Sequence, residues 1–273
     1  MGDAVKRVLF VNSEIFPYLP ESGIANIGRY LPQGIQERKK EIRSFMPRFG
    51  CINERKNQLH ELIRLSGMNI IINDVDRPLV IKVASISAAR MQVYFIDNED
   101  YFHRKQVYRD ENGQFFADNG ERAVFFARGV LETVKKLRWA PDIIHCHGWI
   151  ADILPLYLKK AYKDDPIFSN SKVVLSLYDD IPSESFSDDL KDKILFGGIE
   201  AGDLLPIAEK ADGINLAKLA ALYSDGVIMG SQNIPQEVSD YCGELGVPVL
   251  GYDASSLEDG TYIDEYDKFY DNL

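Results

Sequence analysis

The sequence has few cysteines, few positive charges and no long apolar run, and each shortage narrows the class of protein. Only three cysteines occur among 273 residues. Cys51, Cys146 and Cys242 are too far apart to indicate a metal site or a disulfide framework, so we expect a reducing compartment, the cytoplasm. Forty-two acidic residues against 31 Lys and Arg give a net charge of −11, which argues against nucleic acid or an anionic membrane as a partner. We find no basic leader with an apolar core and no run long enough to span a membrane.

The remaining composition is that of an ordinary globular protein, with 45% hydrophobic and 27% charged residues. A chain of this length can bury one substantial core. Its first apolar run, residues 8–11, predicts a buried parallel strand, and a loop through Gly23 and a helical pattern from Ile24 follow. A strand, a glycine-containing loop and a helix start form a common anion site in α/β sheets, although the pattern is unspecific by itself.

A second helix start is predicted at Asp118. Asp118 is a favourable N-cap residue, and Glu121 stands three positions later, as in a capping box. Apolar residues then recur at helical spacing from Ala123 to Leu137, which predicts a helix packed on a sheet.

His145 and His147 lie two residues apart at the end of another apolar run. Because side chains alternate along a strand, we expect both rings on the same face. A metal site would need further ligands, and His60 and His103 lie in unrelated segments. The pattern therefore favours hydrogen bonding at a strand end, and we predict no metal.

These segments resemble, in order, the bacterial glycogen synthases and plant starch synthases. That family transfers glucose from ADP-glucose to α-1,4-glucan and has two Rossmann-like lobes, the GT-B architecture. The resemblance runs from Arg7 to about Gly230 and covers the N-terminal lobe only. ADP-glucose is the donor that it implies, and it implies no other cofactor. The resembling stretches are residues 8–27, 41–50, 93–123, 142–149, 172–179 and 214–229.

The fold that the resemblance implies is α/β, with a Rossmann-like, doubly wound parallel sheet. We expect a single domain over residues 1–251, with a small β-insertion at about residues 51–96. Residues 252–273 form an acidic C-terminal tail, which we interpret as a solvated or mobile end because such charge runs are most often solvated.

Three positions that carry chemistry in the family are altered in this chain. Pro20 replaces a lysine of the phosphate loop, Gly148 replaces an acidic residue, and Tyr178 replaces a histidine that contacts the transferred glucose. Glu21 also places a negative charge where a phosphate would lie. The pattern predicts that the scaffold is kept and that no catalytic set is intact.

The residues that we expect at the ligand site stand at strand ends and helix starts. Such positions converge at the C-terminal edge of a parallel sheet. The candidates are Glu14, Ser22, Gly23, Asn119, Arg122, His145, His147, Trp149, Tyr178, Asp179 and Asn215.

Three functions are compatible with the sequence. The first is a catalytically impaired synthase-like lobe, a pseudoenzyme that binds α-glucan or a protein partner. The second is an active ADP-glucose:α-1,4-glucan glucosyltransferase completed by a second lobe from another chain or a homo-oligomer, which predicts an exposed apolar face at the missing-lobe side. The third is a protein-interaction module that acts through the acidic, aromatic tail.

Overall fold

The computed structural model describes residues 6–273, so the first five residues of the predicted domain lie outside it. Within these residues no helix combines the length and the apolar character that crossing a membrane requires. The elements are β1 (Arg7–Asn12), α1 (Gly23–Glu37), β2 (Glu41–Pro47), α2 (Glu54–Asn57), β3 (His60–Glu61), β4 (Met68–Ile72), β5 (Val75–Ile86), η1 (Ser87–Ala89), β6 (Met91–Asp97), α3 (Glu99–Phe102), α4 (Asn119–Leu137), β7 (Ile143–His147), η2 (Trp149–Ala151), α5 (Leu154–Lys159), β8 (Lys172–Leu177), α6 (Leu190–Ile194), η3 (Ala201–Ile207), α7 (Gly213–Leu222), β9 (Gly226–Met229), α8 (Gln236–Glu244), β10 (Val249–Leu250), α9 (Ala254–Asp259) and α10 (Tyr262–Asp271).

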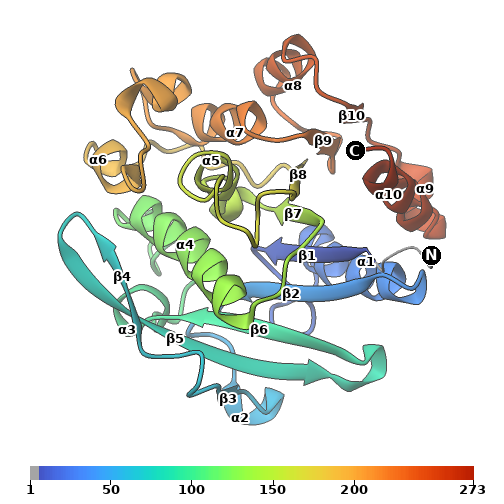
Figure 1. Ribbon diagram of the computed structural model, residues 1–273, viewed down its shortest axis with the longest axis horizontal. Coiled ribbons are helices and arrows are strands. Elements are labelled where there is room, and N and C mark those ends of the chain that lie inside the picture. Colours follow the sequence, from blue (N-terminus) through green and yellow to red (C-terminus); the bar gives the residue numbers. More distant parts are fainter. Residues whose placement is uncertain (1–5) are drawn as a thin grey trace.

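One mostly parallel sheet organises the molecule (Figure 1). Its strand order is β10-β9-β8-β7-β1-β2-β6-β5-β3, and β4 pairs with β5 alone. All pairings from β10 to β6 are parallel, whereas β5 joins β6 in the antiparallel direction. The chain lays β2 and β6 on one side of β1 and β7, β8 and β9 on the other, so the order reverses beside β1. The predicted α/β fold with a mostly parallel sheet is confirmed.

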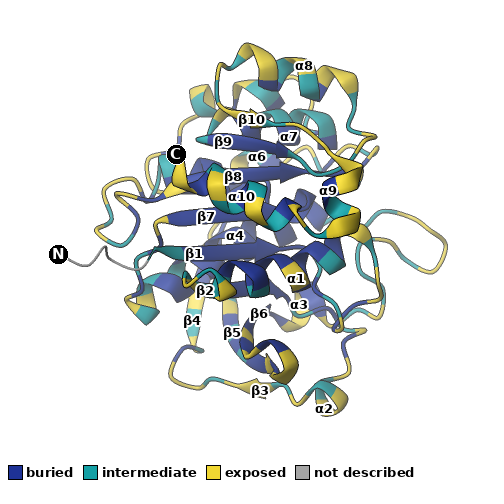
Figure 2. Ribbon diagram, turned by 90° about the vertical axis from the view of Figure 1, so that its right-hand side faces the viewer, coloured by how far each residue is buried: buried dark blue, intermediate teal, exposed yellow. Residues whose placement is uncertain are grey.

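Helices cover both faces of the sheet, and the strand sequences show why. Along β1, Leu9 and Val11 belong to the larger core, and Val8 and Phe10 belong to a smaller core on the opposite face. This alternation follows from the two-residue period of a strand, and a strand buried on both faces is apolar throughout. The larger core includes residues of α4, α5 and α7, and the smaller core includes residues of α1 and α10. Figure 2 shows α1 and α10 in front of the sheet and α4 behind it.

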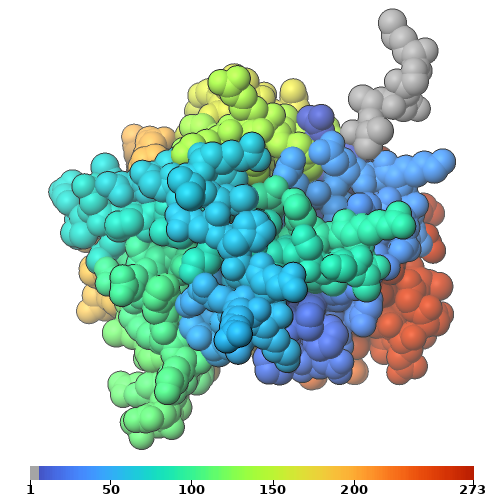
Figure 3. Space-filling view, turned by 90° about the horizontal axis from the view of Figure 1, so that it is seen from below, coloured from blue at the N-terminus to red at the C-terminus, as the bar shows by residue number. Residues whose placement is uncertain are grey.

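An antiparallel extension lies at one edge of the sheet, inside the region where the sequence predicts a β-insertion. It consists of β3, β4 and the long strand β5, and Figure 3 shows the face of the molecule at this end. β6 lies within the predicted insertion but is a parallel strand of the main sheet, paired with β2. Its continuous apolar run from Val93 to Ile96 is typical of such a buried parallel strand.

The expectation that residues 252–273 are a solvated or mobile end is wrong, because this segment forms α9 and α10. Tyr262, Tyr266 and Tyr270 recur every four residues, and all three are buried in the smaller core. The acidic residues occupy the other face of α10, where Asp267 accepts a hydrogen bond from Lys40 Nζ at 2.6 Å. Three of the four tyrosines that an interaction module would expose are therefore buried inside the molecule, and Tyr252 is exposed.

Candidate functional site

A cleft of about 1020 Å³ opens at the C-terminal edge of the parallel strands. The segments that follow β1, β8 and β9 and the start of α1 form part of its lining, and the C-terminal segment from Tyr252 to Ile263 supplies the rest. Ligands of open α/β sheets bind at this edge, where the strand order reverses. Its polar and aromatic lining residues are Glu14, Ser22, Asn26, Tyr30, Tyr178, Asp179, Asp180, Ser231, Tyr252, Glu258, Asp259 and Tyr262.

The start of α1 is occupied by the chain's own side chains. Ser22 is the N-cap, and its hydroxyl oxygen accepts a hydrogen bond from the backbone N–H of Ala25 at 2.9 Å. The same hydroxyl donates to Glu14 Oε2 at 2.6 Å, so a carboxylate already lies beside the helix start. Pro20 and Glu21 are exposed in the preceding loop. The carboxylate of Glu14 thus provides the negative charge that stabilises a helix N-terminus, so the protein itself fills the role that an anionic ligand would have there.

No lysine or arginine belongs to the described residues that line the cleft. Arg29 is the basic residue of α1, but its Nη1 donates to Gln33 Oε1 at 2.6 Å and its guanidinium lies 5.2 Å from the centre of the Tyr30 ring. The cleft therefore has no positive side chain in its lining to balance its carboxyl groups. Those groups are Glu14, Asp179, Asp180, Glu258 and Asp259.

The two histidines of β7 lie on the same face, as the sequence predicts, with ring centroids 3.8 Å apart. A hydrogen bond of 2.8 Å joins His147 Nδ1 to the hydroxyl of Tyr178, which lines the cleft. His145 is bonded on both sides, by Nδ1 to the Tyr270 hydroxyl at 2.6 Å and by Nε2 to Ser176 Oγ at 2.7 Å. Both rings are fully buried directly behind the cleft.

Burial keeps both histidines neutral at neutral pH, because a charged imidazolium is disfavoured away from water. It lowers the pKa of His147 to about 3. It also lowers the pKa of His145 well below its usual value, and the neighbouring His147 acts in the same direction. Among residues 6–273, no group of three or more His, Cys, Asp or Glu side chains is placed to hold a metal ion.

Position 148, where the family has an acidic residue, has no room for a side chain. Gly148 has a φ of +82°, and a Cβ built there would lie 2.1 Å from Ser13 Oγ and 2.9 Å from Asp180 Oδ2. The positive φ favours glycine, and the collision excludes larger residues. Asp180 Oδ2 instead accepts a hydrogen bond from the backbone N–H of Trp149 at 3.0 Å. The carboxyl group of Asp180, in the loop after β8, therefore lies beside this position.

Asp180 is a site residue that the sequence reasoning missed. Burial raises the pKa of its carboxyl to about 7, the N–H of Trp149 opposes this rise, and the charge of Glu14 adds to it. At neutral pH the group is thus able to donate or accept a hydrogen bond toward a ligand. Its position directly after Asp179, at the end of an apolar run, was the available signal in the sequence.

Trp149 lies beside the cleft in a smaller hollow of about 240 Å³, which shares Asp179 and Asp180 with the cleft. Its ring packs against Tyr108 at 4.7 Å and Phe115 at 5.8 Å between ring centroids. Because only 3% of the residue is exposed, Trp149 mainly supports this wall by packing.

Asn119 and Arg122 are fully buried at the start of α4, and neither residue lines the cleft. Asn119 donates to the carbonyl of Tyr108 at 2.8 Å and accepts a hydrogen bond from Arg122 Nη1. Burial lowers the pKa of Arg122 to about 10. Four aromatic rings surround its guanidinium at 5.3 to 5.8 Å, those of Phe49, Phe102, Tyr108 and Phe116.

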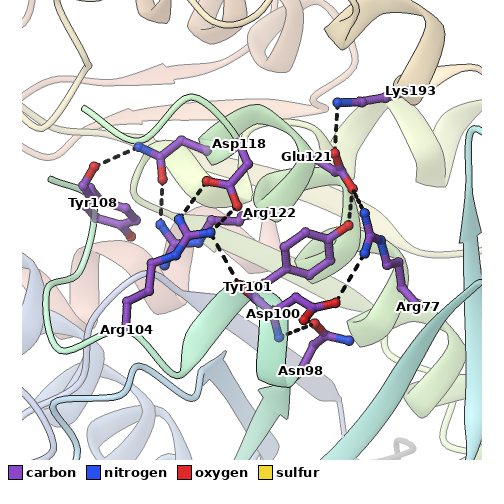
Figure 4. Close-up of polar contacts among 11 residues, drawn as sticks. Arg77, Asn98, Asp100, Tyr101, Arg104, Tyr108, Asp118, Glu121, Arg122 and Lys193 are labelled. Atoms are coloured by element: carbon purple, nitrogen blue, oxygen red, sulfur yellow. Dashed lines mark hydrogen bonds and ion pairs between the residues drawn. The ribbon is translucent and has the colours of Figure 1, made fainter. Parts of the chain in front are cut away.

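The capping box predicted at the start of α4 is wrong, although Asp118 does hold the N-cap position. Asp118 makes no side-chain cap bond and pairs with Arg104 at 2.5 Å (Figure 4). Glu121 binds Lys193 at 2.8 Å and Arg77 at 3.0 Å. Arginine and lysine partners from other segments thus replace the local backbone bonds that the sequence pattern predicts.

Asn215 lies at the start of α7, where its Nδ2 donates to the carbonyl of Lys210 at 2.9 Å, and it does not line the cleft. Of the predicted candidates, Glu14, Ser22, Gly23, Tyr178 and Asp179 line the cleft. The cleft also contains tyrosines that the sequence analysis did not select. These are Tyr30, Tyr252 and Tyr262.

Comparison with known proteins identifies the family of this chain. The pattern of the starch synthase catalytic domain matches residues 7–248. A glycogen synthase of Chlorobium limicola is 37% identical over 232 residues, which cover 81% of this chain and 47% of that protein. A glycogen synthase of Chlorobium luteolum is 34% identical over 75% of this chain and 46% of its own length. The chain therefore spans about half the length of these curated relatives.

A solved structure shares the fold. The catalytic domain of Starch Synthase IV from Arabidopsis thaliana, bound to ADP and acarbose, superposes with a TM-score of 0.68 at 17% identity. The match covers 82% of this chain and 45% of that one. At this identity the likeness establishes the α/β architecture of a GT-B lobe and leaves the chemistry to the residues.

Proposed function

Because the chain belongs to the starch synthase catalytic domain family, we propose that it is a synthase-like lobe that binds α-glucan and does not transfer glucose by itself. One observation carries the proposal. The cleft at the sheet edge contains five carboxyl groups and, among the described lining residues, no lysine or arginine. Such a lining suits a hydroxyl-rich, uncharged ligand and opposes a diphosphate.

The donor ADP-glucose carries two negative phosphates that need positive partners or free N–H groups. Pro20 supplies no charge where the family has lysine, and Ser22 and Glu14 already occupy the start of α1. A carboxylate about 4 Å from a phosphate costs on the order of 1 kcal/mol even in water, and more where water is excluded. Repulsion from several carboxylates therefore outweighs the remaining attraction of the helix N-terminus, which is typically below about 1 kcal/mol.

An α-glucan chain meets a more favourable surface. Its hydroxyl groups donate to carboxylates and exchange hydrogen bonds with Ser231 and Asn26. The rings of Tyr30 and Tyr252 are partly exposed in the cleft and offer flat apolar faces to a sugar ring. A volume of about 1020 Å³ lies at the upper end of the usual range for ligand sites, which suits several sugar units.

Two assays on the purified chain test this proposal together. We expect the protein to co-sediment with glycogen and to transfer no labelled glucose from ADP-glucose to maltoheptaose above the rate in buffer. Bovine serum albumin serves as the control for trapping in the glycogen pellet. Transfer by the chain alone would contradict impaired catalysis, and absence from the pellet would contradict glucan binding.

A second candidate function is an active glucosyltransferase completed by another chain. The observation that favours it is length, since the chain covers only 47% of the glycogen synthase of Chlorobium limicola. The surface favours this candidate less, because a docked second lobe would need an exposed apolar face. Of the large exposed hydrophobic residues in the described part of the chain, only Tyr30 and Tyr252 line the cleft. Transfer that appears only in a mixture with a separately purified second lobe of a relative would select this candidate.

A further inference from the structure

The C-terminal segment forms a wall of the cleft that lies beyond the family match. The family match ends at residue 248, whereas Tyr252, Leu257, Glu258 and Tyr262 all line the cleft. This wall is part of α9, α10 and the segment before them, which lie beside α1 in front of the sheet (Figure 2). The lining of the cleft thus joins residues inside the family match to residues that lie beyond it.

This wall is held firmly enough to serve as a binding surface. Tyr262, Tyr266 and Tyr270 anchor α10 in the smaller core. Arg38 Nε on the chain segment after α1 donates to Asp264 Oδ1 at 2.7 Å, which ties α10 to the neighbouring helix. Because the anchors of α10 are buried, this part of the wall is pre-organised, and a ligand that binds against it loses little conformational entropy of the protein.

Tyr252 stands at the junction of two hollows. It lines the cleft of about 1020 Å³ and also an adjoining hollow of about 480 Å³, and Ser231 is the other residue that both share. Tyr252 is 37% exposed, so its ring is accessible from the cleft side. An extended ligand that continues from one hollow into the other must therefore pass this ring.

The chemistry of the wall selects a neutral polymer. Glu258 and Asp259 accept hydrogen bonds but repel anions, and Asp253 gives the second hollow the same sign of charge. A single hexose would leave most of the combined space empty, whereas a linear oligosaccharide fills both hollows and stacks one ring on Tyr252.

We propose that residues 252–263 add an aromatic subsite to the cleft, with Tyr252 as its platform, and that the occupant is a linear α-glucan of several sugar units that extends into the second hollow. This inference rests on the glucan binding proposed above. It predicts that affinity depends on the length of the chain, because only a long oligosaccharide reaches both hollows.

Calorimetric titration with maltose and with maltoheptaose tests the subsite. We expect maltoheptaose to bind at least about tenfold more tightly than maltose, and Tyr252→Ala to remove up to about tenfold of the maltoheptaose affinity, the worth of one ring contact. Maltose affinity should change less than about twofold, since a disaccharide fits the first hollow. Tyr252→Phe should behave like the unaltered protein because it keeps the ring.

Tyr241→Ala is the matched control, since Tyr241 lies on α8 and lines neither hollow. Equal affinities for the two sugars, or equal effects of Tyr252→Ala and Tyr241→Ala, would overturn the subsite while leaving glucan binding intact. Failure of the unaltered protein to bind glycogen or maltoheptaose would instead overturn the proposed function and the subsite with it. Circular dichroism of each variant shows that loss of affinity is not loss of fold.

Discussion

Individual residues of the site show why some chemistry was predictable and some was not. The common face of His145 and His147 follows from strand geometry, so their spacing was sufficient to predict it. The place of Asp180 depends on a neighbouring strand, because its carboxyl fills the space beside Gly148 that β7 and β8 create together. No local sequence pattern predicts such a contact. The capping box predicted at Asp118 failed for the same reason, because Asp118 pairs with Arg104, which lies outside the helix that Asp118 begins.

The buried His147 makes the protein sensitive to acid. Its pKa is about 3 in the folded state and about 6.5 in the unfolded state. Between these pH values the imidazole of His147 is protonated in the unfolded chain and neutral in the folded chain. Stability contributed by the neutral ring is complete above pH 6.5 and falls by about 1.4 kcal/mol for each pH unit as the pH drops toward 3. We expect His147→Gln to show a shallower loss of unfolding free energy between pH 7 and pH 5.

Urea unfolding at several pH values measures this slope. His60→Gln is the matched control because His60 is exposed on β3. A slope that His147→Gln leaves as steep as in the unaltered protein would show that other groups govern the response to acid.

At the scale of elements, the parallel strands were predictable and the C-terminal helices were not. Residues 8–11, 143–144 and 173–175 are apolar, and short apolar runs of this kind indicate strands that are buried on both faces. In α10 the many acidic residues suggested a solvated segment, although a tyrosine recurs at every fourth position. The helical period was present in the sequence, but whether its aromatic face found a partner depended on a sheet face built from distant residues.

The hydrogen bond between Tyr270 and His145 joins α10 to the central sheet. Both groups are buried, so Tyr270→Phe leaves His145 Nδ1 without its partner. We expect a loss of about 1–3 kcal/mol in unfolding free energy, the cost of a buried polar group left unpaired. Tyr241→Phe, on the half-buried face of α8, controls for removing a hydroxyl, and denaturant melts of the two variants give the comparison. Equal losses in the two variants would contradict a specific stabilising role for the hydrogen bond between Tyr270 and His145.

At the scale of the whole molecule, the family architecture was predictable and the lining of the cleft was predictable only in part. The ordered resemblance from Arg7 to about Gly230 was enough to predict the parallel sheet and the family, and the match over residues 7–248 agrees with it. The cleft was predictable only in part. Glu14, Ser22 and Tyr178 follow strands or precede a helix, whereas Tyr252 and Tyr262 come from the segment after residue 248, where the family match ends.

We propose that this family lobe keeps a ligand cleft and does not bind the nucleotide donor, ADP-glucose. A calorimetric titration of the purified chain with ADP-glucose at neutral pH tests that claim most directly. The carboxyl-rich lining and Pro20 predict no binding heat at millimolar donor, a concentration at which an affinity near 1 mM would be visible. Saturable binding of ADP-glucose at micromolar concentration would contradict the proposed loss of donor binding. It would favour the second candidate, a glucosyltransferase completed by another chain.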